Sequence, residues 1–327
     1  MTDKPPSELV RRCGLLLVLT VSVSVRAQTP AGPTSEDIAF DAVRAATNAA
    51  SSIAAAEEFF ARFPQSNKRV LVARLVVNQL KTIRNPEIGI VLIDRARAIF
   101  TEPDELNFLQ PVAVEIYANG NRIDEAFAAG ASQLSRRPYE FSLLSKLTHL
   151  GAREAHKKNL VHLDASLEYG ARAIELLEHE KRGTEQTDTE WLEAKAQLPS
   201  LYQDIGVIKL AQGKTDEAKV YVLKATQLDA RNPNSFGLLA RILDDDYTKL
   251  RLAYDSTADA GAKADLKVKL DALLDELIET YARAAGLATG RREYIVLLQQ
   301  LIPDLTRHYK ARHNDIGGLQ QLIEKYR

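Results

Sequence analysis

The chain has 327 residues, of which 43 are basic and 44 acidic, so its formal net charge is −1. Its one cysteine, Cys13, and one methionine, Met1, exclude an intrachain disulfide and cysteine-ligated zinc or iron–sulfur centres. The near-zero net charge argues against a nucleic-acid partner, and the 45% apolar content is sufficient for a packed core.

The first residues predict an export signal. Two arginines precede an apolar run from Cys13 to Val25, and this run is shorter than the roughly 20 residues that span a membrane. Small residues at Val25 and Ala27 complete the pattern of a secretory signal peptide. We therefore predict a signal peptide over residues 1–27, cleavage after Ala27, and a periplasmic or secreted protein with no integral membrane span.

Two other interpretations of this stretch stay open, an uncleaved membrane anchor and a buried core segment. A lipoprotein signal is disfavoured, because Cys13 precedes the apolar run whereas a lipidated cysteine follows it. Residues 28–35 hold two prolines and a glycine but no bulky apolar side chain, which predicts a short flexible lead-in. Cleavage would remove four basic and two acidic side chains, and the net charge would change from −1 to −3.

The remainder of the chain has the apolar spacing of helices, with no sustained alternation of apolar and polar residues. Two stripes are clear: Leu198, Leu201, Tyr202, Ile205 and Ile208, and Leu270, Leu273, Leu274, Leu277, Ile278 and Tyr281. Such a stripe must be buried against another helix. Asn85 before Pro86 predicts a capped helix start, and Thr187 with Glu190 has the spacing of a capping box.

We expect these helices to form consecutive pairs within one domain, residues 36–327. The expected pairs are 36–48 with 51–63, 67–84 with 86–100, 104–119 with 122–136, 140–158 with 163–180, 188–211 with 215–229, 234–253 with 258–286, and 291–312 with 315–326. The last pair, within residues 291–327, is expected to cap the stack. Pro303 is expected to kink or restart its helix.

One segment, residues 200–232, carries a family pattern. Its stretch YQDIGVIKLAQGKTDEAKVYVLKATQLDARN resembles a tetratricopeptide repeat (TPR), whose slots are filled by Tyr202, Ile205, Gly206, Gly213, Ala218, Val222 and Ala225. It departs from the pattern at Lys209 and Ala230. Three units that end at Pro64, Pro103 and Pro138 fit more loosely. The resemblance implies an all-α, TPR-like α-solenoid of antiparallel helix pairs, and an irregular helical bundle is the alternative.

The sequence contains no local catalytic or metal-binding motif. The six histidines lack the spacing of a metal site, and no phosphate loop or nucleophile elbow occurs. Asp244, Asp245 and Asp246 are consecutive, so on a helix they point in different directions. We therefore expect surface histidines, solvated aspartates, no catalytic residues, no metal and no cofactor, although residues distant in the sequence could still converge.

The resemblance also implies a binding surface, because in TPR proteins the first helix of each pair lines a concave groove for extended peptides or helices. The implied groove residues are Phe108, Pro111, Glu115, Ala118 and Asn119 in the third pair, and Gln203, Val207, Leu210 and Ala211 in the clearest repeat. One TPR subtype binds a carboxylate through lysine and asparagine. Here those slots hold Gln203 and Val207, or Pro111 and Glu115, so such a clamp is disfavoured. Ordinary surface or stacking contacts are the alternative role.

The sequence thus leads us to expect a non-catalytic scaffold in a bacterial cell envelope or periplasm, which binds a protein or peptide partner. Two alternatives stay open. One is a helical accessory domain in envelope polymer export or turnover, and the other is a self-assembling structural protein.

The signal-peptide prediction can be tested directly. N-terminal sequencing of the exported protein should begin at Gln28, because the small-residue cleavage pattern ends at Ala27. A protein that retains Met1 would contradict the prediction. The mature chain would then contain no sulfur, so its melting temperature should be the same with and without dithiothreitol.

Overall fold

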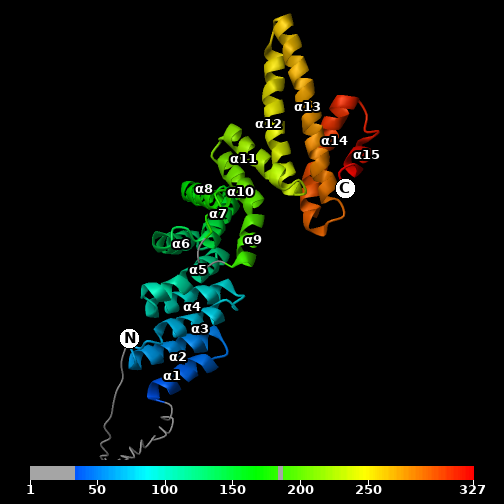
Figure 1. Cartoon of the computed structure of the whole chain (residues 1–327). Coiled ribbons are helices and arrows are strands. Elements are labelled where there is room, and N and C mark those ends of the chain that lie inside the picture. The colour runs from blue at the N-terminus through cyan, green and yellow to red at the C-terminus, as the bar shows by residue number, and fades with distance from the viewer. Residues whose placement is uncertain (1–33, 183–186) are drawn as a thin grey trace, which may run out of the picture.

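The computed structural model describes residues 34–182 and 187–327, so the predicted signal peptide and nearly all of the lead-in lie outside the described residues. Within these ranges the ordered elements are helices and none is a strand (Figure 1). The all-α class is therefore confirmed. The α-helices are α1 (Ser35–Ala45), α2 (Ala49–Arg62), α3 (Arg69–Leu80), α4 (Pro86–Ile99), α5 (Pro103–Asn119), α6 (Ile123–Arg136), α7 (Phe141–His156), α8 (Leu163–Glu178), α9 (Asp188–Ala196), α10 (Leu198–Ala211), α11 (Thr215–Leu228), α12 (Pro233–Ser256), α13 (Ala260–Ala288), α14 (Ile295–His313) and α15 (Leu319–Glu324), with a 3-10 turn, η1 (Arg292–Tyr294), before α14.

The expected helices agree closely with the observed ones, with two differences at prolines. The helix expected over 188–211 is divided into α9 and α10 at Gln197. Pro199 causes this break, because a proline has no N–H to donate to the carbonyl four residues earlier. Pro303 has no such effect. The helix does not restart at Pro303 as expected, since α14 continues through it from Ile295 to His313.

The predicted helix starts are confirmed. The Asn85 side chain accepts hydrogen bonds from the backbone N–H groups of Glu87 and Ile88, at 2.9 and 3.2 Å. Thr187 and Glu190 cap each other reciprocally at the start of α9. Both arrangements satisfy backbone donors that have no partner inside the helix.

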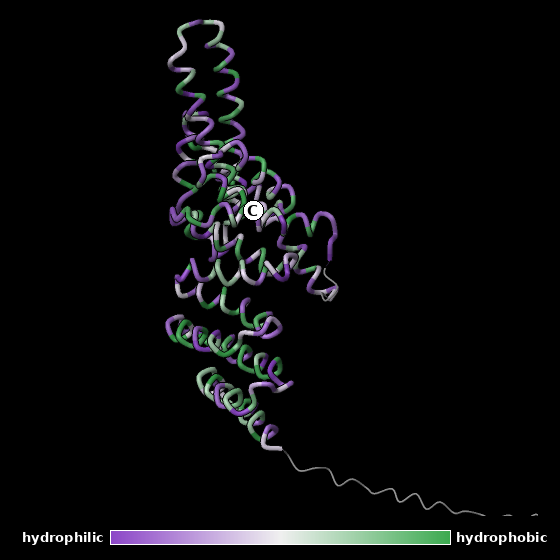
Figure 2. The backbone as a smooth tube through the Cα atoms, turned by 90° about the vertical axis from the view of Figure 1, so that its left-hand side faces the viewer, coloured by the Kyte–Doolittle hydropathy of each residue, from purple (hydrophilic) through white to green (hydrophobic). Residues whose placement is uncertain are grey.

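The helices stack along one direction into an elongated molecule (Figure 1). Most consecutive helices pack together, and several also contact the helix after next, as in α1 with α3, α2 with α4 and α3 with α5. One apolar cluster runs from α1 to α10, and a second joins α11 to α15. Each helix carries both apolar and polar residues (Figure 2), and the α12–α13 hairpin projects beyond the other helices.

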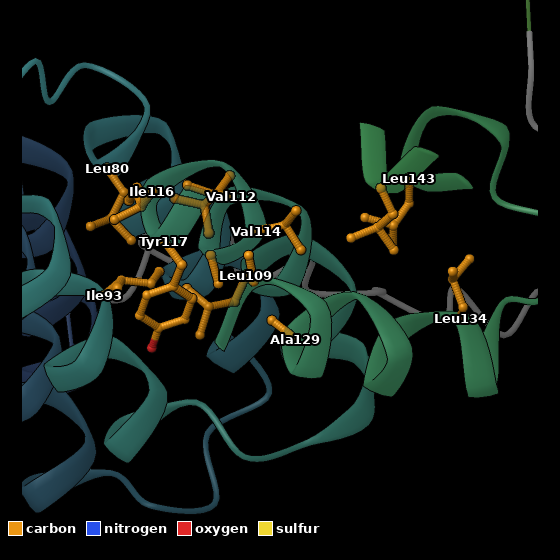
Figure 3. Close-up of a cluster of buried hydrophobic side chains, with 14 of the residues drawn as sticks. Leu80, Ile93, Leu109, Val112, Val114, Ile116, Tyr117, Ala129, Leu134 and Leu143 are labelled. Atoms are coloured by element: carbon orange, nitrogen blue, oxygen red, sulfur yellow. The ribbon is translucent and has the colours of Figure 1, made fainter. Parts of the chain in front are cut away.

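The first cluster is centred on α5 (Figure 3). Leu109 and Tyr117 of α5 are almost completely buried, as are Leu80 of α3 and Ile93 of α4. The Tyr117 hydroxyl donates to Asp94 and accepts from Arg97 Nη1. Burial and the hydrogen bond to Asp94 raise the pKa of Tyr117. The one polar atom of this side chain is thus satisfied at the edge of the core.

Close approach of small residues joins α10 to α11. Ala218, Val222 and Ala225 of α11 are fully buried, and a Cβ placed at Gly206 of α10 would lie 2.5 Å from Val222 Cγ2. Gly151 of α7 has the same role, because a Cβ there would overlap the Ser166 side chain of α8. A glycine in the first helix therefore sets the distance within each of these two pairs.

Replacement of this glycine should weaken the α10–α11 pair. Gly206→Ala gains about 1 kcal/mol of helix propensity, but overpacking costs about 1–3 kcal/mol, and Val222 is too confined to move away. We expect a net loss of about 1 kcal/mol, measured by urea unfolding followed by circular dichroism.

Two further variants test the cause. Gly206→Ala combined with Val222→Ala should cost less than the sum of the single changes, because the new methyl group occupies the vacated space. Gly261→Ala is the matched control, since the nearest atom to its Cβ would be at an ordinary 3.4 Å. Equal losses at Gly206 and Gly261 would contradict close approach as the cause.

Candidate functional site

A concave cavity of about 970 Å³ lies between α5, the α6–α7 loop, α7 and α9. Two side-chain contacts show that α7 lies between α5 and α9. On one side Lys146 Nζ lies 3.0 Å from Glu115 Oε2 of α5, and on the other Ser145 Oγ donates to Gln197 Oε1 at 2.8 Å. Helix α7 is therefore the floor of the cavity, with α5 and α9 as its two rims.

The floor side chains come from one face of α7. Ser142, Ser145, Lys146, His149 and Arg153 are spaced at three and four residues and all line the cavity. The opposite face of the helix is apolar and buried in the core, through Leu143, Leu144 and Leu147. Burial of one face fixes the direction in which the other face points.

Arg153 has one hydrogen-bond acceptor and one ion-pair partner. Its Nη2 donates to the Ala118 carbonyl of α5 at 3.0 Å, and its Nε lies 3.5 Å from Glu154 Oε1. Glu154 is buried. Burial opposes its ionisation, but hydrogen bonds from Lys157 and Asn159 outweigh that cost and lower the pKa of Glu154. The carboxylate is thus charged and orients the Arg153 guanidinium.

His149 is held by a carboxylate of α10. Its Nδ1 lies 3.4 Å from Asp204 Oδ2, and the Asp204 side chain is only 12% exposed. The Asp204 carboxylate raises the pKa of His149 above its usual value, although desolvation acts in the opposite direction. The Ser145 hydroxyl donates to Gln197 and not to His149, so the three residues do not form a Ser–His–Asp relay.

The rims carry the opposite charge. Glu115 of α5 and Glu190 and Glu193 of α9 are exposed and line the cavity. Tyr139, in the loop at one end, is 67% exposed. The cavity therefore combines a cationic floor, acidic rims and an accessible aromatic ring, which are groups suited to binding a charged chain.

The groove residues expected from the sequence fall into three groups. Glu115, Ala118 and Asn119 line this cavity. Gln203 and Val207 line a second cavity of about 510 Å³ between α7, α10, α12 and α14. The remaining four, Phe108, Pro111, Leu210 and Ala211, line neither cavity.

Two of these residues have clear packing roles. The Phe108 ring is half-buried, with the Arg74 guanidinium 4.5 Å from its centroid. Gln203 Oε1 accepts from Ser235 Oγ at 2.7 Å, a bond that joins α10 to α12. Gln203 therefore positions a neighbouring helix in addition to lining the second cavity.

Sequence reasoning missed the floor. Lys146, His149, Arg153, Tyr139 and Glu193 belong to segments without a clear repeat motif, so no slot pointed to them. A signal was present, because Lys146, His149 and Arg153 are basic residues at i, i+3 and i+7 beside a buried leucine stripe.

The expectation of surface histidines is wrong for His308, which is 5% exposed. Its Nε2 lies 2.9 Å from Asp244 Oδ1, and burial lowers the pKa of His308. The expectation of solvated aspartates is wrong for Asp244, which pairs with His308. It is also wrong for Asp246, whose Oδ2 lies 2.9 Å from Lys219 Nζ. The carboxylates diverge because they are consecutive helical residues, and two of them pair with neighbouring helices.

Within residues 34–182 and 187–327, no three histidine, cysteine or acidic side chains are grouped closely enough to hold a metal ion. Across the same described part of the chain, none of the helices combines the length and apolarity of a membrane span. No known family model matches the sequence. No curated protein matches it either.

Loss of the Asp204 carboxylate should change the titration of His149. Asp204→Asn should lower the pKa of His149, measured by proton–carbon NMR of the imidazole, because the anionic acceptor is lost. The raised pKa in the folded state stabilises the protein below the unfolded-state pKa, and this contribution disappears as pH rises through the folded-state pKa.

The substitution should therefore destabilise the fold more at about pH 5 than at about pH 8. Asp164→Asn is the control, because Asp164 on α8 bonds to Gln212 and not to His149. An unchanged titration of His149 in Asp204→Asn would contradict the assigned pairing.

Proposed function

We propose that the helices form a TPR-like solenoid of antiparallel pairs. Three observations support this architecture: the helices are joined by short connections, they contact both the next helix and, in several cases, the one after, and glycines set the spacing within pairs. The α10–α11 pair carries the TPR pattern in sequence, with Gly206 against Val222 and Ala218 fully buried. Gly151 repeats this arrangement in the α7–α8 pair.

We infer that the protein is a non-catalytic scaffold that binds a segment of a partner protein in the cavity floored by α7. The observation that carries this proposal is the position of the cavity. It lies between α5, α7 and α9, which belong to the first halves of three successive pairs. In a solenoid the first helices face the same side, so a cavity between them opens on one continuous surface.

The proposed location is the periplasm or outer surface of a bacterial cell envelope. This rests on the signal-peptide pattern at residues 1–27, a basic start followed by a short apolar run and small residues. If the protein is exported, its partner is located in the same compartment.

Site-specific photocrosslinking tests the binding function. A benzophenone amino acid in place of Asn119, which is exposed and lines the cavity, should give one dominant protein adduct in cells. The matched control places it at Val220, which is 67% exposed on α11 and lies outside the cavity. The expected adduct at Asn119 should be at least about tenfold more abundant than at Val220, a ratio that corresponds to about 1.4 kcal/mol of preference.

Other outcomes contradict the proposal. Equal adducts at both positions would place the partner elsewhere. An adduct of twice the chain mass would support self-assembly, and a polysaccharide adduct would support a role with an envelope polymer.

A further inference from the structure

The cavity floor offers three cationic groups in a line. Lys146, His149 and Arg153 are each tied to an acceptor beside or behind them, which leaves Lys146 Nζ and Arg153 Nη1 with hydrogens for a ligand. His149 Nε2 supplies a further donor when the ring is protonated. Each of the three side chains already has one such contact before a ligand arrives, which reduces the ordering entropy lost on binding.

The rims offer carboxylates on both sides of this line. Glu115 on α5 is 60% exposed as a side chain, and Glu190 and Glu193 are exposed on α9. Glu190 caps the N-terminus of α9 through Thr187, so Glu193 is the rim group on α9 with no internal role. A ligand chain along the floor therefore has cations below it and anions at its flanks.

The spacing of the floor fits an extended chain. At about 1.5 Å of rise per helical residue, Lys146 to Arg153 covers roughly 10 Å. In an extended peptide, residues i, i+2 and i+4 point to the same side and span about 13 Å. Flexible lysine and arginine side chains cover the difference, so acidic residues at every second position can reach the three floor groups.

We propose that the cavity binds an extended peptide segment in which acidic and basic residues alternate. Acidic side chains contact Lys146, His149 and Arg153. The basic side chains between them point away from the floor, and they are long enough to bend to the rim carboxylates of Glu115 and Glu193. The exposed ring of Tyr139 covers one end of the segment. This inference rests on the proposed binding function and adds the chemistry of the partner.

Selection from a random library of ten-residue peptides, displayed on phage, tests the inference on the full chain at about pH 6. Peptides are counter-selected on Ser142→Trp, in which an exposed floor residue is replaced by a bulky ring, with its fold checked by circular dichroism. Cavity-dependent peptides should alternate in charge. Each should bind about tenfold more tightly than a permutation with its acidic residues in one block, a ratio that corresponds to about 1.4 kcal/mol.

Charge-reversal variants provide a second test of the alternating-charge peptide. Lys146→Glu should weaken the alternating peptide about fivefold or more, and so should Glu193→Lys, because each places a like charge against the ligand. Lys224→Glu is the control, since it makes the same change at an exposed position of α11 outside the cavity. A Lys224→Glu effect equal to that of Lys146→Glu would show a general charge effect and overturn the assignment.

The outcomes separate the two proposals. Cavity-dependent peptides without alternation, such as purely acidic ones or helices with charges three and four apart, would overturn this inference and leave the binding function standing. A library that yields no cavity-dependent peptide would overturn the inference and count against the binding function.

Discussion

The structure depends on the inability of a two-helix unit to bury its own apolar surface. A helix in a pair meets its partner along one stripe, and its other apolar residues need a further neighbour. Helix α10 shows this, because it packs against α11 and also against α7 and α8. The apolar cluster is consequently continuous from α1 to α10 and is not divided into one core per pair. The position of any one helix is set by several others.

This constraint produces the cavity. The backbones of α5 and α7 are not in close contact. The two helices are joined by side chains, through Lys146 with Glu115 and Arg153 with the Ala118 carbonyl. Helix α7 is anchored by its buried leucines and by α8 and α10, so it cannot move to close the space. The gap between α5 and α7 remains open and is lined by both apolar and charged side chains.

The sequence was sufficient to predict the helices, because apolar spacing and capping residues act locally. It was insufficient where distant residues decide the outcome. Pro199 and Pro303 look alike in sequence, yet the first divides a helix and the second does not. The burial of His308 is not evident from the sequence, because it depends on Asp244 of α12 and Tyr281 of α13, which are distant in the chain.

The same limit applies to the site. Glu115, Ala118 and Asn119 were found through the repeat pattern, because the third pair follows it well enough to assign slots. The floor of α7 was not found, since the fourth pair departs from the pattern. Asp204 is the extreme case: its role beside His149 depends on the packing of α7 against α10, and no spacing in the sequence reports that contact.

The charges of the cavity favour selection by pattern over selection by net charge. Floor cations are balanced by Glu154 and Asp204 behind them and by the rim carboxylates in front. A balanced site has little long-range field, so it does not concentrate acidic or basic chains in general. Its short-range field nevertheless changes sign between the floor cations of α7 and the rim carboxylates of α9. A ligand gains from such a field only if its own charges change sign over the same distance, and like charges in contact are penalised. Discrimination among charged ligands by such a site therefore depends on the order of charges along the bound segment.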